Sequence, residues 1–122
     1  MSGKWLERSL HTSVASLGLA RNQKEFDKLT ATLGIKNMKW IPNGAGGYTH
    51  QLVSTSGDYA HIVCIDKARH SRCKKSILGT LVHESVHVWQ LHCELIGEKN
   101  PSQEFEAYGI QHIFLKLEKE LN

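Results

Sequence analysis

The sequence predicts a small α+β domain in which helical segments at both ends of the chain flank a central β-hairpin. Apolar residues recur at helical spacing before residue 34 and after residue 73, whereas residues 48–66 form two extended runs around a turn. The 122 residues are 40% hydrophobic and 22% charged, a composition typical of one domain with one core. We therefore expect residues 1–122 to fold as a single unit.

Two short amphipathic helices are expected in the first third of the chain. The apolar residues that define them fall into two runs: Leu6, Leu10, Val14 and Leu17, then Phe26, Leu29 and Leu33. In each run, the spacing of three or four residues places the side chains on one face of a helix. Gly34 follows the second run, as expected at a helix C-terminus. Both helices are expected to cover the core.

A β-hairpin is expected after a turn-rich loop at residues 40–47. Residues 48–53 and 59–66 are rich in β-branched, aromatic and aliphatic side chains. Ser56, Gly57 and Asp58, which lie between these runs, are typical of a tight turn. The two runs therefore read as the antiparallel strands of one hairpin.

The most informative motif of the chain is H-E-x-x-H, which lies within residues 80–89 in a proline-free, largely apolar stretch. On a helix, His83 and His87 lie on one face, so both imidazoles can reach a single ion. Glu84 lies beside them, where it can act on a zinc-bound water without being a ligand. Composition alone gives about 0.04 chance matches to this pattern in the chain, so a zinc site is preferred to a merely structural histidine pair.

A catalytic zinc needs a third protein ligand, and two carboxylates on the next predicted helix compete for this role. Ser102 can cap that helix, which continues through apolar residues to Leu121. Glu104 has Tyr108 one turn further on, and this phenol could hydrogen-bond a ligand or the bound water. Glu106 shares its face with apolar residues and can therefore point inward. These considerations leave both carboxylates open as the third ligand.

Together, the H-E-x-x-H motif and the E-F-E-A-Y sequence of residues 104–108 resemble the gluzincin metallopeptidases, whose third zinc ligand is a glutamate on the next helix. The branch of prenyl-protein and heat-shock membrane peptidases carries E-x-x-A-D at this point. That resemblance implies that Glu104 binds zinc and that Tyr108 takes the aspartate position. The sixteen residues between His87 and Glu104 are fewer than in thermolysin-like members, whereas the eighteen before Glu106 match the aminopeptidase branch. Glu104 is favoured, with Glu106 as the competitor.

The last third of the chain also looks like short metallopeptidases encoded by phages and prophages, through H-E-x-x-H-V-W-Q and E-F-E-A-Y-x-I-Q. The resemblance implies a zincin-like fold, in which a strand beside the HExxH helix binds an extended peptide along its edge. Either strand of the predicted hairpin could serve. The glycines between residues 44 and 47 would form either a flexible lip over the cleft or a plain surface loop.

These expectations combine into a zinc-dependent hydrolase, specifically a metallopeptidase that acts on a peptide or protein substrate. Zinc would be held by the two motif histidines and Glu104, and Glu84 would act as the general base. Tyr108 is the first candidate, and Tyr48 the second, for a side chain that stabilises the oxyanion. Two alternatives are a non-catalytic binding or scaffold protein with a zincin fold and a phage-type amidase that cleaves cell-wall peptides. Glu84 argues against the scaffold because a structural zinc site has no use for a base.

The segment from Lys67 to Lys75 carries five of the fifteen basic residues and no acid. Such a segment is usually a solvated loop. The more specific functional hypothesis is that it makes an electrostatic contact with phosphate, nucleic acid or an acidic protein. Because the net charge is only +3 and this run lacks aromatic residues, nucleic-acid binding is a minor hypothesis. Cys64, His70 and Cys73 lack the fourth ligand and the spacing of a second metal site.

A cytoplasmic protein is expected, in the host cytoplasm if the gene is phage-borne. No apolar run is long enough to cross a membrane, and the start of the sequence lacks a signal-peptide pattern. Three cysteines without C-x-x-C spacing indicate reduced thiols, with Cys64 and Cys93 in the core. His50 and His61 are weak ligand candidates, as is His92, which falls on the opposite side of its helix from the motif.

Overall fold

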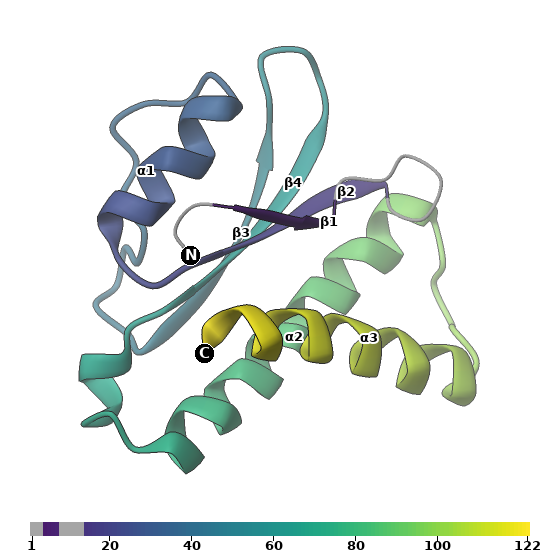
Figure 1. Cartoon of the computed structure of the whole chain (residues 1–122). Coiled ribbons are helices and arrows are strands. Elements are labelled where there is room, and N and C mark those ends of the chain that lie inside the picture. Colours follow the sequence, from purple (N-terminus) through teal and green to yellow (C-terminus); the bar gives the residue numbers. More distant parts are fainter. Residues whose placement is uncertain (1–3, 8–13) are drawn as a thin grey trace.

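A four-stranded mixed sheet with the order β1-β2-β4-β3 forms the centre of this small α+β domain (Figure 1). The computed structural model describes residues 4–7 and 14–122. Its strands are β1 (Trp5–Glu7), β2 (Ala15–Ala20), β3 (Gly47–Val53) and β4 (Tyr59–Ile65). Its helices are α1 (Gln23–Thr32), the short 3-10 helix η1 (Lys67–His70), α2 (Lys74–Ile96) and α3 (Gln103–Leu121). β2 and β4 pair in parallel, and the other two pairs are antiparallel.

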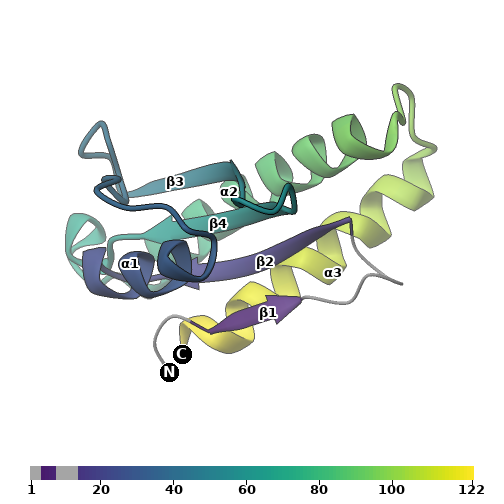
Figure 2. The same ribbon diagram turned by 90° about the horizontal axis from the view of Figure 1, so that it is seen from above.

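Helices cover both faces of the sheet, with α1 on one face and α2 and α3 on the other (Figures 1 and 2). β4 shows this division, because Ile62 and Cys64 pack on the α1 side whereas Val63 and Ile65 pack on the α2 and α3 side. α2 contacts β3 and β4, and α3 contacts β1 and β2. The β3 edge therefore lies on the side of α2 that faces away from α3.

The prediction of the first N-terminal helix is wrong, because Leu6 lies in strand β1 and Leu17 lies in strand β2. Leu10 of that run lies outside the described residues. β2 has partners on both sides and helices on both faces, so nearly all its residues are buried. A strand of this kind has an almost continuous apolar run, which can match helical spacing by chance.

The second predicted helix and the hairpin are confirmed. α1 begins after Asn22, whose side chain accepts a hydrogen bond from the backbone N–H of Glu25, and it buries Phe26 and Leu29 completely. β3 and β4 pair antiparallel, with Gly47 opposite Ile65. Within the described residues, β3 is an edge strand and β4 is paired on both sides. The expectation that either strand could offer a free edge is therefore wrong for β4.

The two C-terminal helices also follow the prediction. The Ser102 hydroxyl caps α3 by accepting the backbone N–H of Phe105. Cys64 and Cys93 are buried free thiols, as expected, and Cys73 is an exposed one. In the described part of the chain, no helix combines the length and the apolar character needed to span a membrane.

Candidate metal and catalytic site

His83 and His87 lie on one exposed face of α2 and direct their Nε2 atoms toward each other. The two Nε2 atoms are 3.1 Å apart. Two nitrogens bound to one tetrahedral zinc at about 2.0–2.1 Å lie about 3.3–3.4 Å from each other. The observed separation is thus close to that of a zinc-bound pair, and it also suits a hydrogen bond between two neutral imidazoles. The i, i+4 spacing predicted this convergence correctly.

Gln90 orients one of these imidazoles. Nδ1 of His87 lies 3.1 Å from Oε1 of Gln90, so the ring donates Nδ1–H to the amide oxygen. In the neutral ring this tautomer leaves Nε2 of His87 unprotonated, as a metal ligand requires. Sequence reasoning missed Gln90, although its position three residues after His87 on the same helix was a usable signal.

Glu84 has a different environment from the two histidines, since it is buried and only 5% exposed. Its Oε1 accepts a hydrogen bond from the Thr49 hydroxyl at 2.7 Å. Thr49 lies on β3, 35 residues earlier in the chain. Sequence reasoning missed this partner because no local pattern links a strand residue to a helix residue at that separation.

A cleft of about 560 Å³ lies between α2 and the start of β3. Its lining comprises motif residues, three further α2 residues, the start of β3 and the loop before it, and it includes His83, Glu84, His87, Tyr48, Thr49 and Glu94. Gly47 permits this close approach, because a Cβ atom there would lie 2.6 Å from Cγ2 of Thr80. Tyr48, the second oxyanion candidate, lines the cleft, but its ring contacts His50 and packs on the α1 side of the sheet.

The loop before β3 forms one wall of the cleft through Asn43 and Ala45. The backbone N–H of Asp66 donates to the Gly46 carbonyl at 2.9 Å, and Nε2 of His70 lies 3.3 Å from the same oxygen. His70 is therefore the residue of the basic segment 67–75 that contacts this loop oxygen, while Arg69, Arg72, Lys74 and Lys75 of that segment are exposed.

The register of β3 determines which backbone groups border the cleft. Residues 46 and 66, and residues 54 and 58, face each other and are hydrogen-bonded at the two ends of the hairpin. In an antiparallel pair, hydrogen-bonded positions alternate, so the even residues of β3 bond to β4. Thr49 and Gln51 consequently direct their N–H and C=O groups away from β4, toward the open edge.

The structure does not bring either predicted third ligand to the histidines. Oε2 of Glu106 accepts a hydrogen bond from Nε1 of Trp89 at 3.2 Å. Trp89 lies about 200° around α2 from His87, at about 100° per residue. Glu104 is exposed in the first turn of α3. Among residues 4–7 and 14–122, no group of three or more His, Cys, Asp or Glu side chains could hold an ion.

Besides Glu84, a second acidic side chain, Glu94, shares the cleft with the histidine pair. It lies seven residues, or about two turns, after His87 on the same helix face. Sequence reasoning did not consider it, although the i, i+7 spacing placed it on that face.

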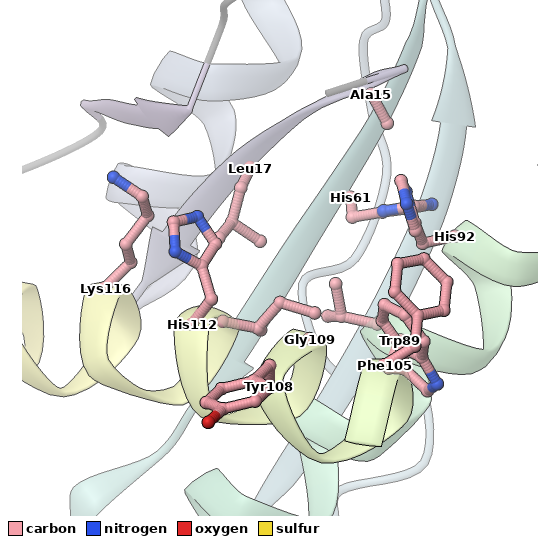
Figure 3. A pocket seen from close by; sticks show the side chains of 12 residues that line it. Ala15, Leu17, His61, Trp89, His92, Phe105, Tyr108, Gly109, His112 and Lys116 are labelled. Atoms are coloured by element: carbon pink, nitrogen blue, oxygen red, sulfur yellow. The ribbon is translucent and has the colours of Figure 1, made fainter. Parts of the chain in front are cut away.

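Tyr108, the first oxyanion candidate, lines a different cavity on the α3 side of α2 (Figure 3). This cavity has a volume of about 280 Å³, and His61, Trp89 and His92 also line it. Burial, with a smaller contribution from His92, lowers the pKa of His61 to about 4. Nε2 of His61 bonds Oε1 of Gln51 at 2.9 Å.

The converged imidazoles and the buried carboxylate fit two ligands and the base of a zinc centre, whereas the third ligand is not assembled with them. Imidazole nitrogen is a preferred zinc donor, and a carboxylate beside the ligands can move protons. His50 of β3, a weak ligand candidate from the sequence, is buried, and its Nε2 lies 2.6 Å from the Trp40 carbonyl oxygen.

No protein-family model matches this chain, and no curated protein or solved structure matches it either.

Proposed function

We propose that the protein is a zinc-dependent peptidase whose centre is built on His83, His87 and Glu84. The observation that carries the proposal is the convergence of the two Nε2 atoms, 3.1 Å apart, in the same cleft as a buried carboxylate. When bound there, zinc supplies Lewis acidity and makes water acidic enough to lose a proton near neutral pH. The other tasks in the reaction belong to side chains of this chain.

Glu84 acts as the general base and then as the general acid. It takes a proton from the attacking water and returns that proton to the leaving amine of the cleaved peptide bond. Its Oε1 already accepts the Thr49 hydroxyl, so Oε2 is the atom available for the proton. Neither candidate oxyanion donor faces the histidines, because Tyr108 lines the other cavity and the Tyr48 ring packs against His50 on the α1 side of the sheet.

For the third ligand we propose Glu104, on the strength of its E-x-x-A-Y context. Glu106 is the weaker candidate because its carboxylate is bonded to the Trp89 indole. Glu94 is a third candidate because it lines the cleft with the histidines. Measurement of zinc affinity in variants of these three carboxylates tests which of them is the third ligand.

We infer that the substrate is an extended peptide that adds to the β3 edge. The outward N–H and C=O groups of Thr49 and Gln51 can pair with a peptide main chain independently of its side chains. Thr49 is also the residue beside Glu84, so a strand paired there lies next to the base.

The three free thiols suit a reducing compartment such as the cytoplasm.

The matched substitutions Glu84→Gln and Glu98→Gln test the proposal, since Glu98 is exposed and does not line this cleft. Zinc content, folding and cleavage of peptide-library and cell-wall peptide substrates would be measured for both variants and the wild type. Glu84→Gln should keep zinc and lose about 10²- to 10⁴-fold in rate, whereas Glu98→Gln should keep both. Cleavage of cell-wall peptides alone would favour the amidase. Zinc-loaded wild type that cleaves neither class would support the scaffold instead.

A further inference from the structure

We propose that Thr49 is a positioning residue, which aligns the carboxylate of Glu84 with a substrate strand held on β3. The inference rests on the proposed function and adds a role for a residue outside the H-E-x-x-H motif. Thr49 contacts Glu84 with its side chain and offers its main chain to the open edge of the sheet. One residue therefore touches both the base and the expected position of the substrate.

The side-chain contact fixes how the carboxylate is turned. An ionised carboxylate only accepts hydrogen bonds, so the Thr49 hydroxyl is the donor in its 2.7 Å contact with Oε1 of Glu84. The same hydroxyl oxygen lies 3.5 Å from the backbone oxygen of Glu84. With Oε1 held in this way, Oε2 lies toward Gly47, 3.2 Å from the position that a Cβ atom there would take.

Burial makes this single contact matter. Glu84 is 5% exposed, so bulk water does little to hold its carboxylate in one orientation. A hydrogen bond to a charged group in such surroundings is short and stronger than one between neutral groups. Free rotation of the carboxylate would move the proton acceptor out of line with the scissile bond, and misplacement by about 1 Å can cost about 100-fold in rate.

The main-chain contact comes from the register of the hairpin. Thr49 occupies an odd position of β3, whose N–H and C=O groups point away from β4. A peptide strand that pairs with these groups is held by the same residue that holds the base. Gly47 keeps β3 close enough to α2 for this arrangement, because any side chain there would meet Thr80 and Glu84.

A purely structural role predicts a different outcome. If the hydrogen bond only anchored β3 to α2, its loss would lower the free energy of unfolding and would not selectively lower kcat. If Thr49 positions the base, its loss should lower kcat while leaving KM and zinc content nearly unchanged. The backbone groups that pair with substrate remain in every side-chain variant, so KM is the internal control.

Three variants would be compared with the wild type: Thr49→Val, Thr49→Ser and Thr55→Val. Valine keeps the shape and β-branching of threonine but removes the hydroxyl, serine keeps the hydroxyl, and Thr55 is an exposed turn residue that controls for the substitution itself. We expect Thr49→Val to lower kcat by about 10- to 100-fold with KM within about twofold. Thr49→Ser should recover most of the turnover, to within about threefold of wild type. Thr55→Val should match the wild type.

Each outcome has a distinct meaning, because hydrolysis by wild type and its loss in Glu84→Gln are measured in the same assay. Normal kcat in Thr49→Val overturns the role of Thr49 and leaves the proposed function standing. Equal losses in the valine and serine variants, together with a lower melting temperature, also overturn it in favour of a structural anchor. Absence of hydrolysis by zinc-loaded wild type overturns the proposed function and this role with it.

Discussion

The Nε2 atoms of His83 and His87 lie 3.1 Å apart across one turn of α2. We expect the purified protein to bind about one zinc ion per chain, and either histidine-to-alanine substitution should abolish binding. Gln90→Ala should retain zinc but bind it about 10- to 100-fold more weakly, because the bond that orients His87 is lost. Elemental analysis and competition with a chelator measure these effects.

Gln111→Ala is the matched control, since Gln111 is an exposed residue of α3. Its zinc affinity should equal that of the wild type. Unchanged zinc content in both histidine variants would rule out this centre. Equal affinity in Gln90→Ala and Gln111→Ala would show that the amide does not orient the ligand.

The three candidate carboxylates can be ranked by the same chelator competition. Glu104→Gln should lower zinc affinity by the largest factor, because the E-x-x-A-Y context makes Glu104 the proposed third ligand. Glu106→Gln should have a smaller effect on zinc affinity, since this carboxylate accepts a hydrogen bond from the Trp89 indole N–H. The amide oxygen of glutamine can accept the same hydrogen bond. Glu94→Gln tests the acid that lines the cleft. The largest loss in either of the last two variants would transfer the ligand role to that residue.

The sequence predicted those parts of the site that depend on one helix. His83, Glu84 and His87 lie within five residues, so helical geometry alone places two imidazoles together and the carboxylate beside them. Thr49 could not be predicted because its contact with Glu84 depends on how β3 packs against α2. The same reason applies to Glu104, whose distance from the histidines depends on the packing of α3.

Leu17 illustrates the corresponding limit for the fold. Its spacing from Val14 suggested a helix, but its true environment is an inner strand between β1 and β4. Long-range pairing outweighs local spacing in such a strand, because burial on both faces removes the alternation that identifies an edge strand. α1 was predictable because one face is exposed, which leaves Phe26, Leu29 and Leu33 at helical spacing.

Amide hydrogen exchange should reveal the open edge of β3. The N–H groups of His50 and Leu52 donate to β4 in the observed register, whereas those of Thr49 and Gln51 point outward. We expect the outward amides to exchange faster by a factor on the order of 10 or more, as measured by NMR. Addition of a peptide substrate to Glu84→Gln should slow the exchange of the Thr49 and Gln51 amides. Faster exchange at His50 and Leu52 would show that the register is shifted by one residue.

Two helical glycines provide a matched test of the packing between α2 and α3. A Cβ atom on Gly109 would lie 2.5 Å from Cε3 of Trp89, whereas one on Gly79 would meet nothing within 4 Å. Gly109→Ala should therefore destabilise the protein by about 1–3 kcal/mol through overpacking. Gly79→Ala should stabilise it by about 0.5–1 kcal/mol, because alanine favours a helix. Urea unfolding measures both changes, and equal effects in the two variants would contradict the close contact of α3 with Trp89.

His61 should make the stability of the protein depend on pH. Burial lowers the pKa of its imidazole to about 4, below the value of about 6.5 in an unfolded chain. Between these two values the unfolded chain binds a proton that the folded protein does not. The contribution of neutral His61 to the free energy of unfolding is therefore complete above about pH 6.5 and is lost as the pH falls toward 4. Between pH 7 and pH 5 the free energy of unfolding should fall by about 2 kcal/mol through this group. Urea unfolding of wild type and His61→Gln at both pH values isolates this effect, because other titrating groups are common to the two proteins. The variant should lose less stability than the wild type on acidification, and identical losses would show that His61 titrates normally in the folded state.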